Sequence, residues 1–293
     1  YLVSRMAREH VTVALSGDGG DELFGGYERY RRLNQLAHVR GYLPMPVRRY
    51  LAIAMQAVSV SGWDRIVQGF TGSVFPRALR HRTGHRVHKL ARVLQAGSSD
   101  DIYSVMMSLG DSSGPLVIGG QDAPSVGPRG SGLFASEDFT PAEIGMLIDS
   151  QVYLPDDLLT KVDRASMAVS LEVRSPFLDP DLFRFAWSLP ADCRIRDGQG
   201  KWIVRQFLRG LLPDYLIDRP KVGFGIPIGE WLRGPLKPWA DDLLDPGVIT
   251  EQEYLDPASV SRIWRTHRDG TDDFTYQLWA VLMFQAWLSE AEL

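Results

Sequence analysis

Apolar and polar positions at the start of the chain predict a strand, a loop and a helix. Residues Val11–Leu15 form a short, mostly β-branched apolar run, followed at once by glycines and acidic residues. Such a run is typical of an interior strand of a parallel sheet. Glycines in stretch 16–20 favour a sharp turn, and a helix is expected to begin near Glu22.

Helical periodicity dominates the rest of the chain. Residues 29–95 are mostly helical by pattern, with a break at Pro44 and an amphipathic helix over 47–58. Pro141 is expected in the first turn of another helix, and a second apolar helical face follows Pro155. Near the C-terminus, a nearly all-round apolar pattern predicts a core helix of under about 15 residues, too short to span a bilayer. Its large residues are Tyr276, Trp279, Val281, Leu282, Phe284 and Trp287.

Two stretches lack any periodicity. Residues 110–132 are interrupted repeatedly by Gly, Ser and Pro, which predicts a connecting loop. Its segment 127–132 resembles a phosphate loop in composition only, because no strand precedes it. Residues 241–256 carry Asp, Gly and Pro, so we expect a second break there without a new domain.

Composition narrows the functional classes. With 293 residues, 44% hydrophobic and 23% charged, the chain can bury a sizeable core. Its net charge of −4 argues against a nucleic-acid partner, since such proteins carry an excess of Lys and Arg. One cysteine, Cys193, excludes an internal disulfide, and no apolar stretch reaches the roughly 18 residues of a membrane span. We therefore expect a cytoplasmic enzyme with no membrane partner.

The acidic loop after the first predicted strand is the strongest candidate for chemistry. Its glycines can bring backbone N–H groups against a phosphate or a nucleobase. Asp18 and Asp21 lie three residues apart, and Mg²⁺ binds through one or two carboxylates together with substrate oxygens. The same pattern also fits a plain strand-to-helix connection in which either aspartate caps the helix. Taken alone, the loop leaves both interpretations open.

Two other groups of polar residues have competing interpretations. His81, His85 and His88 have helical spacing, which fits either a metal site or a solvated helix face. Glu172 and Arg174 flank a valine in an otherwise apolar stretch, where charges are seldom buried without partners. They predict an ion pair, which either organises the wall of an active site or is purely structural.

Three stretches together resemble the glutamine-hydrolysing asparagine synthetases. Residues 16–27 read S-G-D-G-G-D-E-L-F-G-G-Y, similar to the family's second nucleotide motif, S-G-(E/D)-G-x-D-E followed by G-G-Y. Residues 154–179 are similar to its long mid-domain helix and the loop after it. Residues 200–227 resemble the segment that carries its catalytic lysine. The three stretches occur in family order, so the combined match is far more specific than any one alone.

The resemblance implies a fold and a set of site residues. The fold would be α/β: the edge of an adenine-nucleotide α-hydrolase-like (Rossmann-like) parallel sheet, with a predominantly α-helical remainder. Ser16 and Gly17 would contact the AMP part of ATP, and Asp21 would coordinate Mg²⁺. Asp18 would support formation or aminolysis of an acyl-adenylate, although glutamate is commoner in the family there. Lys221, which by itself reads as an exposed loop lysine, would bind the leaving pyrophosphate.

The resemblance also implies a reaction and its partners. The side-chain carboxylate of aspartate would attack the α-phosphorus of MgATP, giving a β-aspartyl-adenylate and pyrophosphate. Ammonia from glutamine would then displace AMP and form asparagine. The chain contains neither an S-G-G-x-D-S pyrophosphate loop nor the N-terminal cysteine of a glutaminase. We therefore expect residues 1–293 to be the C-terminal portion of a synthetase domain, inactive alone, served by an N-terminal glutaminase domain of the parent chain.

Several alternatives stay open at this point. Related enzymes use the same scaffold to adenylate other carboxylates, including ring-closing synthetases of the β-lactam or lasso-peptide type. A non-catalytic helical interaction module with a decayed nucleotide site is a second alternative, against which the intact Asp18, Asp21 and Lys221 argue. A homodimer is also left open.

Overall fold

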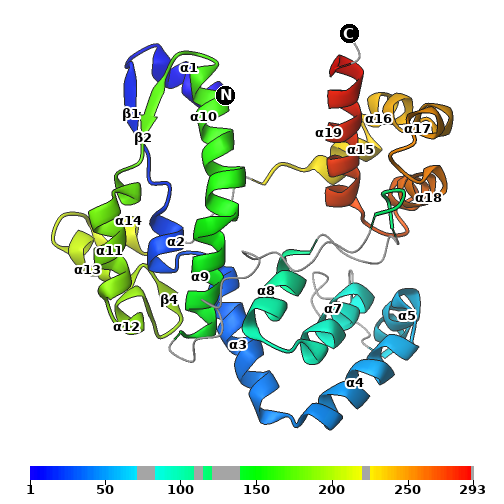
Figure 1. Ribbon diagram of the computed structural model, residues 1–293, viewed down its shortest axis with the longest axis horizontal. Helices are drawn as coiled ribbons and strands as arrows, with labels where there is room; N and C mark the ends of the chain where they lie inside the picture. The colour runs from blue at the N-terminus through cyan, green and yellow to red at the C-terminus, as the bar shows by residue number, and fades with distance from the viewer. Residues whose placement is uncertain (71–82, 109–114, 121–138, 220–224, 292–293) are drawn as a thin grey trace. The chain divides into compact units, whose positions relative to one another are not determined.

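A computed structural model describes residues 1–70, 83–108, 115–120, 139–219 and 225–291. Within these residues the chain is mostly helical and has two two-stranded sheets (Figure 1). It divides into two compact units, which we describe separately. The first unit comprises Tyr1–Ala57, Lys89–Met106 and Ser125–Pro220, and the second comprises Val58–His88, Met107–Pro124 and Lys221–Leu293.

The predicted first strand is present, but it is not buried. Strand β1 (Val13–Leu15) pairs in parallel with β2 (Glu172–Arg174), and Val13 lies opposite Glu172. Leu15 is 74% exposed and Val13 is 39% exposed, so the expected interior strand is wrong for the described chain. The reason is that burial of a parallel strand requires neighbouring layers on both faces. Among the described residues, β1 pairs only with β2.

The remaining elements of the first unit are almost all helices. Those before residue 110 are α1 (Leu2–Arg8), α2 (Gly20–Phe24), α3 (Glu28–Tyr42), α4 (Met45–Ala57) and α8 (Ser99–Met107). Those after residue 140 are α9 (Pro141–Gln151), the π-helix η2 (Leu154–Leu159), α10 (Thr160–Met167), the 3-10 helix η3 (Pro176–Leu178), α11 (Pro180–Ser188), α12 (Ala191–Arg194), α13 (Trp202–Arg209) and α14 (Asp214–Ile217). Strands β3 (Ile195–Arg196) and β4 (Gln199–Gly200) form an antiparallel hairpin.

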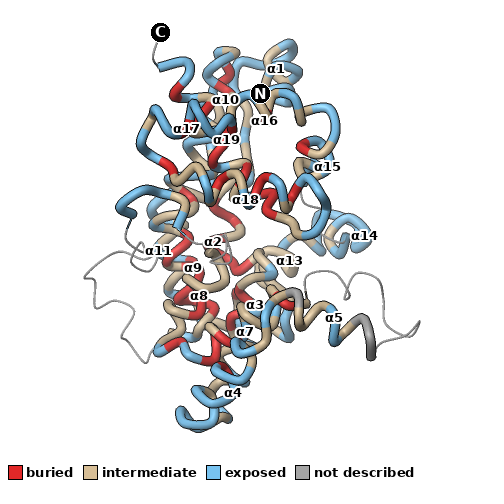
Figure 2. Tube along the Cα trace, turned by 90° about the vertical axis from the view of Figure 1, so that its right-hand side faces the viewer, coloured by how far each residue is buried: buried red, intermediate tan, exposed pale blue. Residues whose placement is uncertain are grey.

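Helix α9 is at the centre of the first unit. Its predicted start is confirmed: Thr140 caps it, Pro141 is its first residue, and Thr140 and Glu143 form a reciprocal capping box. Most of its residues are buried, as the red segments along α9 indicate (Figure 2). Helix α3 packs closely on it, because a Cβ at Gly145 would lie only 2.9 Å from the Leu33 side chain.

The second unit has its own hydrophobic core around α19 (Thr275–Ala291). The other helices are α5 (Val60–Phe70), α15 (Ile228–Arg233), α16 (Lys237–Leu243), α17 (Pro246–Gln252) and α18 (Pro257–Arg268), while α7 (Thr83–Gln95) begins in this unit and ends in the first. Leu278 and Leu282 of α19 are fully buried. Tyr276 and Trp287 are 63% and 62% exposed, so only one face of α19 belongs to the core. The helix has 17 residues, which is longer than the predicted length of under about 15.

Two sequence predictions about loops have different outcomes. The predicted break at 241–256 contains a helix, α17, whose N-terminus is capped by Asp245. Asp256 likewise caps α18, so these Asp-Pro pairs mark helix starts. The predicted loop at 110–132 lies largely outside the described residues, and its described part makes a β-bridge between Val117 and Leu255. None of the described helices combines the length and the apolar character needed to cross a membrane.

Candidate functional site

The loop between β1 and α2 has the tight turn that its glycines predict. Gly19 adopts a left-handed conformation, with φ of 87°, directly before α2. A Cβ at this position would lie 2.5 Å from Leu178 Cδ2, so the loop packs against η3 with no room for a side chain. At Gly17, by contrast, a Cβ would meet no heavy atom within 4 Å. The loop is therefore held on one side and open at Gly17.

A hydrogen-bonded set of polar side chains joins the ends of the two parallel strands. The Ser16 hydroxyl donates to Asp18 Oδ2 at 2.7 Å, and Ser16 Oγ lies 2.9 Å from Ser175 Oγ. Because a carboxylate only accepts, the single hydroxyl proton of Ser16 is committed to Asp18, and Ser175 donates to Ser16. Carboxyl ends of parallel strands meet at one sheet edge, which is where ligands bind in open α/β sheets. Ser16 and Asp18 are thus placed where a ligand is expected.

Asp21, the predicted metal ligand, is paired with a lysine from a distant part of the chain. Lys201 Nζ lies 3.2 Å from Asp21 Oδ1, and the two side chains are 34% and 22% exposed. Lys201 has a left-handed backbone, with φ of 57°, and its N–H donates to the Phe24 carbonyl at 2.7 Å. The β3–β4 hairpin also packs closely against the residue that follows α2, since a Cβ at Gly200 would lie 2.0 Å from the Gly25 carbonyl oxygen.

Lys201 is not among the site residues predicted from the sequence. A local signal for its position does exist, because Asp197-Gly198 is a preferred two-residue hairpin turn. Both residues have positive φ, 52° and 76°, as that turn requires. The turn predicts a hairpin ending at Gly200, but nothing in it predicts that the next residue contacts Asp21.

Glu22, beside Asp21, is a buried carboxyl group. It is 1% exposed and accepts a hydrogen bond from the Tyr27 hydroxyl at 2.8 Å. Burial raises the pKa of Glu22 above its ordinary value, while the hydrogen bond from Tyr27 opposes that shift. Burial also raises the pKa of the Tyr27 hydroxyl. Glu22 therefore stabilises the end of the loop through Tyr27 rather than by facing a ligand.

A buried polar cluster connects α3 to α9 next to this loop. Asp149 has no exposed surface and accepts hydrogen bonds from Tyr30 at 2.5 Å, from Tyr103 and from Arg29 Nε at 2.8 Å. The Arg29 guanidinium also lies over the Tyr27 ring, 4.0 Å from its centroid. Burial alone would lower the pKa of Arg29, but the charge of Asp149 raises it overall. The cluster fixes the direction in which α3 leaves the loop.

The structure brings together four of the five predicted site residues. Ser16, Gly17 and Asp18 lie on the loop after β1, and Asp21 lies in the first turn of α2. Their chemistry suits a magnesium nucleotide, since Mg²⁺ takes one or two carboxylates and completes its shell with substrate oxygens and water. Lys221 lies outside the described residues. Its predicted role is therefore not tested.

Glu172 and Arg174 form the predicted ion pair. Arg174 Nε donates to Glu172 Oε1 at 2.7 Å, but the two side chains are 65% and 54% exposed. They lie on β2, in register with β1. An exposed pair of this kind contributes little to stability, typically about 0–1 kcal/mol.

The predicted histidine spacing does not form a metal site in the described residues. His85 Nε2 pairs with Asp272 Oδ2 at 2.5 Å, and His88 Nε2 hydrogen-bonds to the Val58 carbonyl at 2.8 Å. His81 lies outside the described residues. Within the part of the chain that the structure covers, no group of three or more His, Cys, Asp or Glu side chains is arranged to hold a metal.

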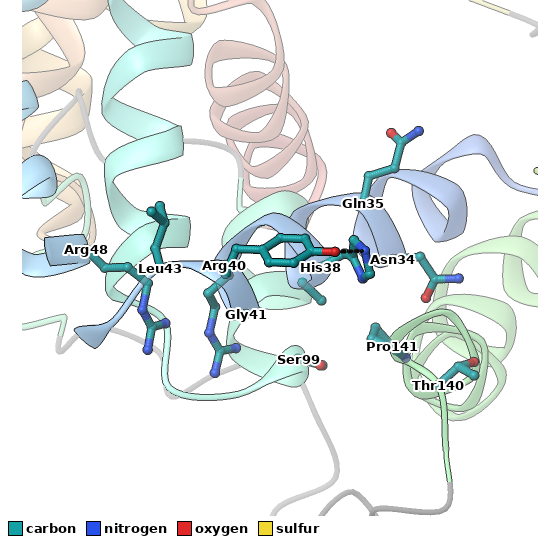
Figure 3. A pocket seen from close by; sticks show the side chains of 12 residues that line it. Asn34, Gln35, His38, Arg40, Gly41, Leu43, Arg48, Ser99, Thr140 and Pro141 are labelled. Carbon is teal, nitrogen blue, oxygen red and sulfur yellow. Dashed lines mark hydrogen bonds between the residues drawn. The ribbon is translucent and has the colours of Figure 1, made fainter.

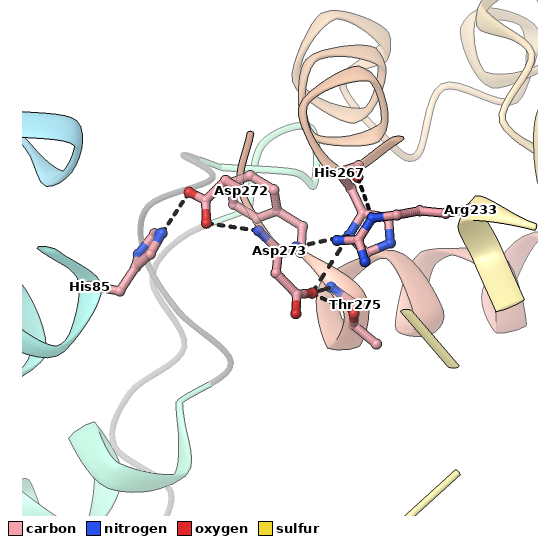
Figure 4. Close-up of polar contacts among 7 residues, drawn as sticks. His85, Arg233, His267, Asp272, Asp273 and Thr275 are labelled. Atoms are coloured by element: carbon pink, nitrogen blue, oxygen red, sulfur yellow. Dashed lines mark hydrogen bonds and ion pairs between the residues drawn. The ribbon is translucent and has the colours of Figure 1, made fainter. Parts of the chain in front are cut away.

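His85 belongs instead to a polar cluster in the second unit (Figure 4). The fully buried His267 accepts the Phe274 N–H at its Nδ1, at 3.3 Å, so the ring proton is on Nε2. Arg233 Nε donates to the His267 carbonyl at 2.8 Å, and Asp273 accepts from the Thr275 N–H at 2.9 Å. These contacts hold the ends of α15, α18 and α19 together, so the cluster is structural.

A parallel pair of strands, with a glycine-rich acidic loop after β1, defines this chain as an α/β protein with a candidate nucleotide site. The family model for asparagine synthase matches residues 1–289, and the chain belongs to that family.

The chain is similar to known proteins along nearly its whole length. It is 34% identical to a Mycobacterium tuberculosis protein named as a putative glutamine-hydrolysing asparagine synthetase, over 98% of this chain and 40% of that protein. It is 26% identical to asparagine synthetase 1 of Bacillus subtilis, over 99% of this chain and 42% of that protein. It thus spans about two fifths of the length of these relatives. No solved structure matches it.

Proposed function

We propose that the protein containing these residues makes asparagine from aspartate, with ATP as the energy source and glutamine-derived ammonia as the nitrogen donor. One observation carries the proposal: Asp18 on a glycine-rich loop at the carboxyl edge of β1 and β2, and Asp21 in the first turn of the helix that follows, belong to a chain of the asparagine synthase family. Because a carboxylate has no leaving group, amidation requires prior activation. Adenylation by ATP provides the leaving group, which is AMP.

In the proposed reaction the aspartate side-chain carboxylate attacks the α-phosphorus of ATP. A bond forms between carboxylate oxygen and phosphorus, pyrophosphate leaves, and ammonia then displaces AMP to give asparagine. Ser16 and Gly17 would contact the AMP part, and the open space beside Gly17 supports this. Asp18 would support formation or aminolysis of the adenylate, with Ser16 and Ser175 fixing its orientation.

Asp21 would coordinate Mg²⁺, and the metal when bound would neutralise phosphate charge as the pyrophosphate leaves. Lys201 holds that carboxylate near the loop and supplies a positive charge beside it. Lys221 would stabilise the leaving pyrophosphate, a role that depends on the sequence resemblance alone. Each group acts on charge that develops at the phosphates.

We further propose that residues 1–293 are the C-terminal portion of the synthetase domain of a longer chain. The exposed apolar side chains on α1, on β1 and on the segment between them support this, since more sheet and helix could cover them. They include Leu2, Val3, Met6, Val11, Val13 and Leu15. A glutaminase domain N-terminal to these residues would supply ammonia. Cytoplasmic location and a homodimer remain predictions.

The test uses the full-length parent protein with ATP, aspartate and either glutamine or ammonium. We expect AMP, pyrophosphate and asparagine in equal amounts, measured by chromatography and a pyrophosphate-coupled assay. Asp21→Ala should lower kcat/KM at least roughly 100-fold. Asp181→Ala, at a 90% exposed side chain on α11, is the matched control and should leave activity unchanged. Release of ADP, or turnover that does not depend on aspartate, would contradict the proposal.

A second candidate is favoured by one departure from the family. Asp18 stands where glutamate is commoner. Its side chain is shorter by one methylene, so its carboxylate extends less far toward a substrate. A related adenylating amidotransferase or a ring-closing synthetase acting on another carboxylate would fit this change. AMP release with a panel of other carboxylic acids, but not with aspartate, would favour this candidate. A non-catalytic interaction module would instead bind ATP without Mg²⁺ dependence, or not at all.

A further inference from the structure

The first unit contains a pocket that is separate from the nucleotide loop. It has a volume of about 910 Å³ and is lined by residues from the C-terminal half of α3, the start of α4, and the starts of α8 and α9. No residue of the loop 16–21 belongs to its lining. The volume lies within the range of about 300–1,000 Å³ that is typical of small-molecule sites.

Two arginines give the pocket its charge. Figure 3 shows the guanidinium groups of Arg40 and Arg48 extending in the same direction, on the side of the pocket where Ser99 lies. None of the described lining residues is acidic. A carboxylate that acts on Arg40 is that of Asp101. It accepts hydrogen bonds from the Gly97 and Ser98 N–H groups and is not part of the lining. The pocket is therefore strongly cationic.

The Arg48 side chain is half-buried, and part of its guanidinium lacks hydrogen-bond partners among the described residues. Its Nε and Nη1 atoms are buried and make no hydrogen bond within the part of the chain that the structure describes. Arg40 is better satisfied, since its Nη2 donates to the Gly97 carbonyl at 2.6 Å. Burial lowers the pKa of Arg40, and the neighbouring charge of Arg48 lowers it further. Two neighbouring like charges, one of them with buried donors that lack a partner, are costly unless an anion compensates them.

The rest of the lining offers a surface for the body of a ligand. Tyr42 and Leu43 are partly apolar walls, and His38 Nε2 lies 3.1 Å from the Tyr42 hydroxyl, which orients that ring. The hydroxyl of Ser99 and the side-chain amide of Asn34 add hydrogen-bonding groups. An anionic end with an apolar and polar body beside it is the pattern of a phosphorylated metabolite.

We propose that this pocket binds a phosphate-bearing small molecule, with its phosphate between the guanidinium groups of Arg40 and Arg48. A phosphate monoester carries close to two negative charges at neutral pH, which matches the two cations. Its three oxygens also accept the forked donors of a guanidinium better than a single carboxylate does. This inference does not depend on the proposed asparagine synthesis, because the two sites share no residue.

The test measures inorganic phosphate binding to the full-length protein by isothermal titration calorimetry at low salt, with sulfate as a competitor. We expect Arg48→Gln and Arg40→Gln each to weaken phosphate binding at least tenfold. Arg49→Gln is the matched control, because Arg49 is the next residue of α4, is exposed and lines a different pocket. With Mg²⁺ added to the titration, Asp21→Ala identifies any phosphate that binds through the metal at the nucleotide loop instead.

Two sets of results would overturn the inference. One is a phosphate affinity of Arg48→Gln within twofold of the unsubstituted protein. The other is binding that Asp21→Ala abolishes and Arg48→Gln does not affect, which would place the phosphate at the nucleotide loop. Circular dichroism and the thermal midpoint show whether each variant folds. If Arg48→Gln does not fold, Arg40→Gln and Arg48→Lys decide the outcome, and the lysine variant should bind with intermediate affinity because it keeps the charge but not the fork.

Discussion

The ammonium of Lys201 lies 3.2 Å from the carboxylate of Asp21, so the residue that follows the β3–β4 hairpin neutralises the predicted metal ligand at the start of α2. Both side chains are partly exposed, which leaves the carboxylate accessible to a cation from solution. A metal that binds Asp21 must therefore compete with an ammonium that is already present.

Removing this competitor should ease metal binding. We expect Lys201→Met to lower the Mg²⁺ concentration at half-saturation of ATP binding by roughly 1.4- to fivefold, since exposed ion pairs are worth about 0.2–1 kcal/mol. Fluorescence titration with a labelled ATP analogue measures this. Lys161→Met is the control, because Lys161 pairs with Asp157 in an exposed helical pair and should leave the Mg²⁺ dependence unchanged. A higher Mg²⁺ requirement in Lys201→Met would contradict the competition.

Asp18 should affect catalysis much more than stability. It lies on a partly exposed loop and accepts a hydrogen bond from Ser16, so Asp18→Asn should leave the thermal midpoint nearly unchanged. If the carboxylate takes part in adenylate chemistry, the same change should lower kcat by roughly 100-fold or more. Asp18→Glu, which restores the commoner family residue, should retain activity. Ser175→Ala is the control, and a loss of activity as large as that of Asp18→Asn would assign the role to the hydroxyl pair instead.

The buried pair of Arg194 and Glu143 should be important for folding of the first unit. Arg194 donates to Glu143, and the two side chains are only 3% and 9% exposed. Burial lowers the pKa of Arg194, and Glu143 partly offsets this shift. Arg194→Met would leave the Glu143 charge buried without its partner, so we expect a loss of about 3–5 kcal/mol in the free energy of unfolding.

Chemical denaturation followed by tryptophan fluorescence measures this change. Arg184→Met is the matched control, because Arg184 forms a largely exposed pair with Asp181 on α11. It should unfold at nearly the same denaturant concentration as the unsubstituted protein. Equal effects of the two substitutions would show that burial of the Arg194 pair has no energetic consequence.

Asp241 should make the stability of the second unit depend on acid. Its carboxylate accepts hydrogen bonds from Lys237 at 2.8 Å and from the Trp264 indole at 2.8 Å. The Lys237 contact is the main cause that lowers the pKa of Asp241 below its ordinary 3.8. A lowered folded-state pKa stabilises the fold above pH 3.8, and this contribution is lost as the pH falls through the folded value.

Asp241→Asn should therefore be less stable than the unsubstituted protein at pH 7, and the difference should disappear as the pH falls below the ordinary pKa. Thermal unfolding of both proteins between pH 2.5 and pH 7 tests this. Asp242→Asn is the adjacent control, with no such pH-dependent difference expected. A stability difference that stays constant with pH would rule out the charge of Asp241 as its cause.

Local sequence signals mark the starts of helices, but some of these starts were predicted to be loops. Thr140, Pro141 and Glu143 form the capping box that begins α9, where a helix was expected. Asp245 and Asp256 have the same role before α17 and α18, but their stretch was interpreted as a break. The reason is chemical, because Asp followed by Pro favours both a turn and the first turn of a helix.

The sequence by itself determined the strand, the glycine-rich turn and the identity of the acidic loop, because these depend on local backbone preferences and on a motif within 12 adjacent residues. Only the tertiary structure decided that β1 is exposed, that Lys201 meets Asp21, and that Arg40 and Arg48 share one pocket. Lys201 and Asp21 are far apart in the chain, and Arg40 and Arg48 lie on two different helices, so local backbone preferences do not determine these arrangements. They follow from the pairing of β1 with β2 and from the docking of the β3–β4 hairpin and of α3, for which no periodic pattern exists.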